Sequence, residues 1–179
     1  MASGMDEGVE HDQRRSTGLV KVWFALEVDH EGWPPAGSEG MWAEPVGGGR
    51  YRVDNMPWFV RGLACGDVVE AQPDEAGVLW ATAGVSWSGR LAIRVIPFRA
   101  GSLGGSVAAV LEAFETLGVS GESAEPVFPI AALDVSPAAD WRAVKALLVA
   151  GEVYGRWSYE EGCVDDRWRS LGSREGSAS

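Results

Sequence analysis

The hydrophobic pattern of the chain changes near residue 100, and this change limits the fold more than any other feature of the sequence. Between residues 20 and 28 the apolar side chains of one face occupy every second position, which is the period of a β-strand. Between residues 103 and 117 the apolar residues instead recur three or four positions apart, as on one face of a helix. This order of patterns excludes all-helical and all-strand folds and predicts an α+β protein.

Residues 19–90 form the predicted β-rich half. Short apolar runs alternate there with stretches rich in Gly, Pro, Asp and Ser, and the three glycines at 47–49 suit a hairpin connection. We expect five or six strands, arranged as an antiparallel meander or a small open barrel.

Residues 91–164 are predicted to follow the order βαββαβ of a ferredoxin-like half. The runs 91–98 and 128–135 are almost entirely apolar, which predicts two central strands covered on both faces. Ser136 followed by Pro137 is typical of an N-cap and the first position of a helix.

The segments 1–18 and 165–179 are polar and rich in Gly, Ser and charge, so we expect two flexible tails. The first has no apolar core of a secretory signal, and no run approaches the roughly 18 apolar residues of a membrane span. We therefore expect a cytoplasmic protein whose two cysteines, Cys65 and Cys163, are reduced and buried.

The net charge of -11 narrows the class of partner. Phosphate groups are repelled on average, so we expect neither a nucleic acid nor an anionic membrane as partner. A basic peptide or protein is electrostatically compatible. The same charge is also explained by solubility alone.

Motifs of established chemistry are missing from the sequence. It contains no spacing typical of a hydrolase triad, a phosphate-binding loop or a zinc site. His30 stands between Asp29 and Glu31, and three consecutive side chains on a strand cannot all face one ion. We predict no catalytic residue, no metal and no cofactor.

Aromatic residues are the unusual feature, with nine tryptophans in the chain. Trp33 in the stretch G-W-P-P and Trp58 in N-M-P-W-F stand in loops beside prolines. Such tryptophans are either rigid contact anchors for a partner or caps on the ends of a small barrel.

The stretch 51–70 reads Y-x-V-D-N-x-P-W-F and, after a leucine, G-D-V-V. This pattern resembles the bacterial domain-of-unknown-function family 4265. Trp23, Trp42, Ser88-Gly89, Arg94 and the closing W-S-Y-E-E are also similar to that family, so the resemblance covers about residues 19–164. It implies the same architecture and a bacterial, cytoplasmic protein, but no reaction. Typical members have phenylalanine after the motif proline, where this chain has Trp58.

The motif also has a physical interpretation that needs no ligand. Asn55 can bond nearby backbone in an Asx-type turn, and Pro57 forces the residue before it into an extended conformation. Phe59 can then close one end of the barrel.

We therefore expect a non-enzymatic binding or accessory protein. It would hold a peptide or protein partner through the loop aromatics or along an open sheet edge. The predicted partner-binding residues are Trp33, Trp58, Arg61, Asn55 and Arg94.

The alternative is a small enzyme. It would use Asp54, Asp67 or Glu39 as acid and base beside Arg61 as an anion clamp. A pocket that gathers Asp54, Arg61 and Arg94 would favour the enzyme, and a flat or grooved aromatic surface would favour the binding protein.

Overall fold

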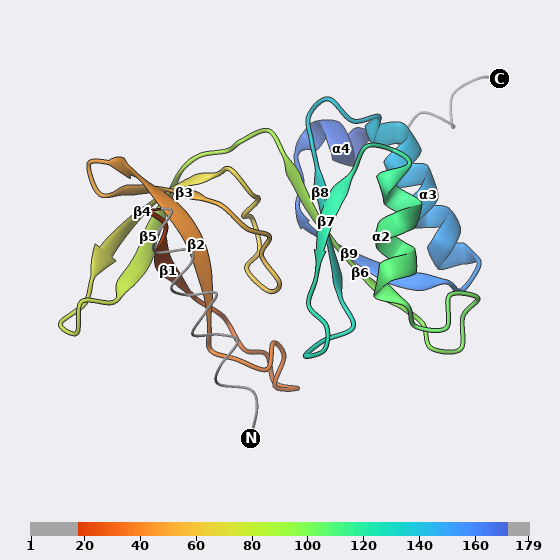
Figure 1. Cartoon of the computed structure of the whole chain (residues 1–179), viewed down its shortest axis with the longest axis horizontal. Coiled ribbons are helices and arrows are strands. Elements are labelled where there is room, and N and C mark those ends of the chain that lie inside the picture. Colours follow the sequence, from red (N-terminus) through yellow and green to blue (C-terminus); the bar gives the residue numbers. More distant parts are fainter. Residues whose placement is uncertain (1–17, 172–179) are drawn as a thin grey trace. The chain divides into compact units, whose positions relative to one another are not determined.

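The computed structural model describes residues 18–171, which divide into two compact units (Figure 1). Of these residues, 18–55 and 66–88 form the first, which we call the barrel unit. Residues 56–65 and 89–171 form the second, the sheet unit. The short stretch 56–65 thus leaves the predicted β-rich half and belongs to the other unit. The expected tail 1–18 lies outside the described residues except for Gly18.

The barrel unit is a closed barrel, not the meander or open barrel expected from the sequence. Successive strands pair antiparallel, and the first and last pair in parallel through Val22 with Leu79 and Trp23 with Trp80. This last pairing closes the sheet and leaves it no edge strand. The strands are β1 Val20–Ala25, β2 Ser38–Gly47, β3 Arg50–Val53, β4 Val68–Pro73 and β5 Leu79–Ser86.

Alternating residues of these strands fill the barrel, as the two-residue period predicts. Val22, Met41 and Ala43 are fully buried, and the alternation along each strand directs them to the barrel interior. The hairpin expected at the three glycines is present, and all three have positive φ, which only glycine adopts readily.

The sheet unit contains four strands in the order β7-β8-β6-β9, with antiparallel neighbours throughout. The two apolar runs predicted as central strands are β6 and β8, which occupy the two inner positions. The strands are β6 Leu91–Pro97, β7 Ser120–Ser123, β8 Ala131–Val135 and β9 Trp157–Cys163. The helices are α2 Val107–Glu115, α3 Trp141–Val153 and α4 Asp166–Ser170.

The start of α3 differs from the expectation at Ser136. The N-cap is Asp140, whose carboxylate accepts the backbone N–H groups of Arg142 and Ala143. Ser136 instead accepts the N–H of Ala138 in the turn before the helix. Both residues are good caps, and the one nearer the periodic apolar stripe begins the helix.

The prediction of a flexible tail over residues 165–179 is wrong for residues 165–171. Asp165 accepts the N–H of Trp168 and begins the short helix α4. Trp168 is fully buried, and its indole N–H donates to Glu161 at 2.7 Å. Residues 165–171 therefore belong to the folded sheet unit.

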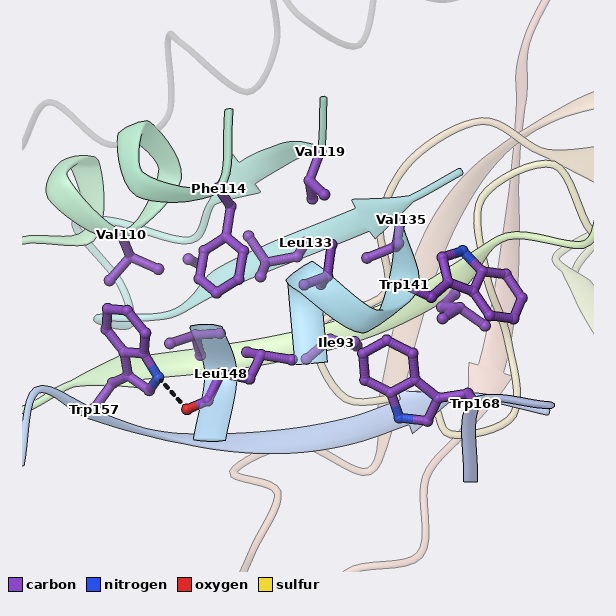
Figure 2. Close-up of a cluster of buried hydrophobic side chains, with 14 of the residues drawn as sticks. Ile93, Val110, Phe114, Val119, Leu133, Val135, Trp141, Leu148, Trp157 and Trp168 are labelled. Atoms are coloured by element: carbon purple, nitrogen blue, oxygen red, sulfur yellow. Dashed lines mark hydrogen bonds between the residues drawn. The ribbon is translucent and has the colours of Figure 1, made fainter. Parts of the chain in front are cut away.

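One face of the sheet carries the large hydrophobic core, with α2 and α3 packed over it (Figures 1 and 2). The rings of Phe114 and Trp157 lie 5.6 Å apart, and those of Trp141 and Trp168 lie 6.4 Å apart. Figure 2 shows the indole N–H of Trp157 donating to the carbonyl of Leu148, at 3.1 Å. This bond satisfies a polar group that would otherwise be costly to bury in the core.

Candidate functional site

The segment Met56–Cys65, which carries the N-M-P-W-F motif, covers the other face of the sheet; we call it the cover segment. It contains no regular helix or strand. Met56 and Ala64 are buried against a group of small side chains on the sheet, and Trp58 and Cys65 pack partly buried against the same group. These small side chains let the backbone of the cover segment approach the sheet closely; they are Ala92, Ala132 and Cys163.

Backbone hydrogen bonds attach the cover segment to the sheet at two points. Met56 donates its N–H to the Glu122 carboxylate on β7 at 3.3 Å. Gly62 donates to the carbonyl of Gly162 on β9 at 2.8 Å. An irregular segment needs such partners, because buried backbone groups without them are costly.

Arg94 on β6 holds the middle of the cover segment. Its side chain is 4% exposed, and its Nη1 donates to the carbonyls of Val60 at 3.0 Å and Pro57 at 3.4 Å. Its Nε donates to Glu160 Oε2 on the neighbouring strand at 2.9 Å. Among the described residues, no hydrogen-bond partner reaches its Nη2. The buried side chain of Arg94 thus helps to position the cover segment.

Glu160 lies between two arginines. One oxygen accepts from Arg94, and the other pairs with Nη2 of Arg61, whose side chain is 78% exposed. Sequence reasoning missed Glu160. The signal was Arg94 itself, because an arginine in an otherwise apolar central strand requires a buried or half-buried carboxylate nearby.

Phe59 and Trp58, which were expected to cap the barrel, both belong to the sheet unit. The ring of Phe59 meets Phe128 edge-on, with centroids 5.4 Å apart. Phe128 lies in the connection between β7 and β8. Trp58 is half-buried, so little of its indole is available to a partner.

Asn55 is the last residue of the first stretch of the barrel unit. Its side chain does not form the expected Asx-type turn but accepts a hydrogen bond from a residue distant in the sequence. Its Oδ1 accepts the N–H of Trp42 at 2.7 Å, 13 residues earlier in the chain. Asp54 donates its own N–H to the carbonyl of Trp42 at 2.8 Å. The motif asparagine thus holds the end of β3 to β2.

The carboxylates of the alternative hypothesis all lie in the barrel unit, whereas Arg61 and Arg94 lie in the sheet unit. Asp67 is 5% exposed and accepts the N–H of Ser88 at 2.7 Å, which is a structural role. Glu39 is also buried, and Asp54 is exposed. In residues 18–171 no group of three or more His, Cys, Asp and Glu side chains is placed to hold a metal ion.

Trp33 lies in the barrel unit at the end of a tight turn. Asp29 Oδ1 accepts the N–H groups of Glu31 and Trp33, both at 2.9 Å, and Asp29 N–H donates to the Trp33 carbonyl at 2.8 Å. Gly32 has φ +81 and allows the reversal. In this hydrogen-bonded turn Trp33 remains 45% exposed.

These residues can be compared with known proteins. A family model, "Domain of unknown function (DUF4265)", matches residues 39–159. The chain belongs to this family. The match confirms the family inferred from the motif, and it includes the cover segment and Arg94. No curated protein matches the chain.

A solved structure shares the fold. It is described as the novel crystal structure of a hypothetical protein from Neisseria gonorrhoeae. The TM-score is 0.66 at 18% sequence identity, and the likeness covers 81% of this chain and 94% of the other. None of the helices described for this chain is long and apolar enough to cross a membrane.

Proposed function

We propose that this protein is a non-enzymatic binding protein that holds a peptide or protein segment at the turn of Trp33. The observation that carries the proposal is the 45% exposure of an indole whose backbone is already fixed by hydrogen bonds to Asp29. Binding a partner there costs little conformational entropy, and tryptophan is enriched among residues that dominate binding energies.

The surroundings of Trp33 favour a basic partner. Val28 next to the turn is 49% exposed and extends the apolar surface. Glu27, Asp29 and Glu31 are exposed acidic residues of the same stretch. A peptide with an apolar residue beside an arginine or lysine fits this combination, since an indole face and carboxylates both attract a cation.

The sheet unit supports a second mode of the same function. Its strands β7 and β9 are at the two ends of the sheet order, and an extended peptide can add to such an edge through backbone hydrogen bonds. We propose the turn as the primary contact, because the exposed side chain there supplies specificity.

We also infer that the sheet unit is ferredoxin-like. The element order βαββαβ and the antiparallel order β7-β8-β6-β9 support this topology. A cytoplasmic location is part of the proposal and is supported by the two cysteine thiols.

The test is a Trp33→Ala variant with Trp87→Ala as matched control, because Trp87 is an equally exposed tryptophan of the barrel unit at 46%. Peptides selected from a random phage-displayed library against the wild-type protein are the probes, and calorimetry measures their affinity. We expect Trp33→Ala to weaken binding at least tenfold, about 1.4 kcal/mol, and Trp87→Ala to leave it unchanged.

Urea denaturation of both variants separates binding from stability. We expect almost the same midpoint as wild type for Trp33→Ala. A stability loss of about 3–5 kcal/mol would instead identify Trp33 as a core cap. Unchanged affinity in Trp33→Ala would also overturn the proposal.

A further inference from the structure

The two cysteines of the chain both belong to or pack against the same small cluster of the sheet unit. Cys163 at the end of β9 is 9% exposed and is a member of the cluster beneath the cover segment. Cys65 is the last residue of the cover segment and packs half-buried against this cluster. Both are present as thiols. They come from positions almost 100 residues apart in the sequence.

A β-bulge turns Cys163 toward the cover segment. Regular alternation along β9 would place it with Trp157 and Tyr159, which face the helical core. The pairing with β6 shifts, however, so that Ala92 opposes Cys163 while Ile93 opposes Glu161. Gly162 is the extra residue of the bulge. One extra residue moves the side chains that follow it to the opposite face of the sheet. Cys163 therefore shares the face of Ala92.

Gly162 also brings the cover segment to this point. A Cβ atom at Gly162 would lie 2.9 Å from Nη2 of Arg94, so the bulge position has no room for a side chain. Its carbonyl accepts the N–H of Gly62 at 2.8 Å. Cys163 follows Gly162 directly, and Cys65 is three residues after Gly62, a distance of at most about 10 Å along the chain.

Arg90 of the sheet unit interacts electrostatically with Cys65 and is paired with a carboxylate. Arg90 precedes Ala92 by two positions and binds Asp134 through Nε at 2.7 Å and Nη2 at 2.6 Å. The pKa of Arg90 is raised mainly by its hydrogen bond to Asp134, with a smaller contribution from the charge of Cys65. The reactive form of a cysteine is its thiolate.

We propose that Cys65 and Cys163 are a redox pair that forms a reversible intramolecular disulfide on exposure to a peroxide. The half-exposed Cys65 thiolate attacks hydrogen peroxide, the O–O bond breaks, and Cys65 becomes a sulfenic acid as the other oxygen leaves as water after protonation. The Cys163 sulfur then attacks the Cys65 sulfur, the S–S bond forms, and the sulfenic hydroxyl leaves as a second water. Two thiols are oxidised and one hydrogen peroxide is reduced to two waters.

The disulfide would join the cover segment covalently to the bulge of β9. This inference is independent of the function proposed for Trp33, because the turn of Trp33 belongs to the barrel unit.

The experiment treats the full-length protein with a small excess of hydrogen peroxide, alkylates the remaining thiols and analyses the peptides by mass spectrometry. We expect monomeric protein that has lost two hydrogen atoms, with both cysteines protected from alkylation and both recovered after dithiothreitol. In Cys163→Ser we expect dimedone to trap a sulfenic acid at Cys65. In Cys65→Ser we expect Cys163 to react at least tenfold more slowly, because it is 9% exposed.

Three results would overturn the inference. One is stable oxidation of wild-type Cys65 while Cys163 can still be alkylated. Another is a disulfide between two copies of the chain. The last is survival of both thiols under conditions that oxidise a free cysteine. If a serine variant does not fold, the wild-type measurement alone decides between the disulfide and these results. The dimedone experiment is then repeated with alanine in place of serine.

Discussion

Arg94 joins three parts of the sheet unit through one side chain: its own strand, the carboxylate of Glu160 on β9, and two carbonyls of the cover segment. A charge with 4% exposure is stable only while these partners remain. Arg94, which lies outside the motif, is therefore one of the residues that hold the motif segment in place.

Two substitutions at the same ion-pair cluster should differ strongly in effect. Glu160→Ala leaves the buried charge of Arg94 without its carboxylate, and we expect the free energy of unfolding to fall by about 3 kcal/mol. Arg61→Ala removes the 78% exposed partner of the same carboxylate, and we expect a loss of under about 1 kcal/mol. Urea denaturation measures both. Equal losses would show that the pair with Arg94 contributes no more than a surface pair.

At Gly151 on α3 we expect glycine to be more stable than alanine, the opposite of the usual helix preference. A Cβ atom there would overlap the indole of Trp157, which is fully buried. Gly151→Ala should therefore destabilise the protein by about 3 kcal/mol, although alanine normally stabilises a helix by about 1 kcal/mol over glycine. Ala146→Gly on the exposed side of the same helix is the control and should cost about 1 kcal/mol. Thermal denaturation that finds Gly151→Ala more stable than wild type would contradict this packing.

At the scale of the elements, α4 shows how one side chain can hold a short helix. Five residues are too few for a stable isolated helix, but Trp168 is fully buried in the core. Lys145 on α3 donates to the carbonyl of Trp168 at 2.9 Å, and its ammonium group lies 5.2 Å from the indole centroid. The helix thus depends on contacts that its own sequence does not reveal.

Trp168→Ala should cost about 3–5 kcal/mol of stability, as expected for removing a large buried aromatic side chain. Tyr154→Ala, at a residue 77% exposed just after α3, is the control and should be nearly neutral. Both are compared by chemical denaturation and near-ultraviolet circular dichroism. A small effect of Trp168→Ala would mean that residues 165–171 are the flexible tail expected from the sequence.

Strand β1 and the two long helices could be predicted because their apolar residues repeat with the period of the element. The central positions of β6 and β8 followed from apolar runs without alternation. Three features could not be predicted in this way. Closure of the barrel rests on two pairs between β1 and β5, the bulge is a single glycine, and α4 has one apolar anchor. None of these leaves a periodic signal.

The sequence singled out candidate residues one by one but did not indicate which of them lie together. Trp33 is 45% exposed, and its role as an anchor stays a prediction. Arg94 and Arg61 were singled out from the sequence, but their shared carboxylate Glu160 was missed because cross-strand pairing depends on register.

At the scale of the whole molecule, the two compact units do not follow one another along the sequence. The cover segment is inserted between β3 and β4 of the barrel, yet its hydrogen bonds to Glu122 and Gly162 and its packing on the small side chains assign it to the sheet unit. Neither compact unit is therefore a continuous stretch of chain. Cutting the chain near residue 90 would separate the sheet from the segment that covers its second face.

Hydrogen exchange should reveal this division, because amides become exchangeable with the cooperative unit that protects them. In increasing urea, peptides from the cover segment should lose protection at the same concentration as peptides from β6 and β9, and not with those from β2 and β3. Trp168→Ala provides the control, since it weakens the core of the sheet unit alone. In this variant the cover segment should exchange faster together with β6 and β9, while β2 keeps its wild-type rate. Protection of the cover segment that instead followed β2 and β3 in both proteins would assign it to the barrel and contradict the division.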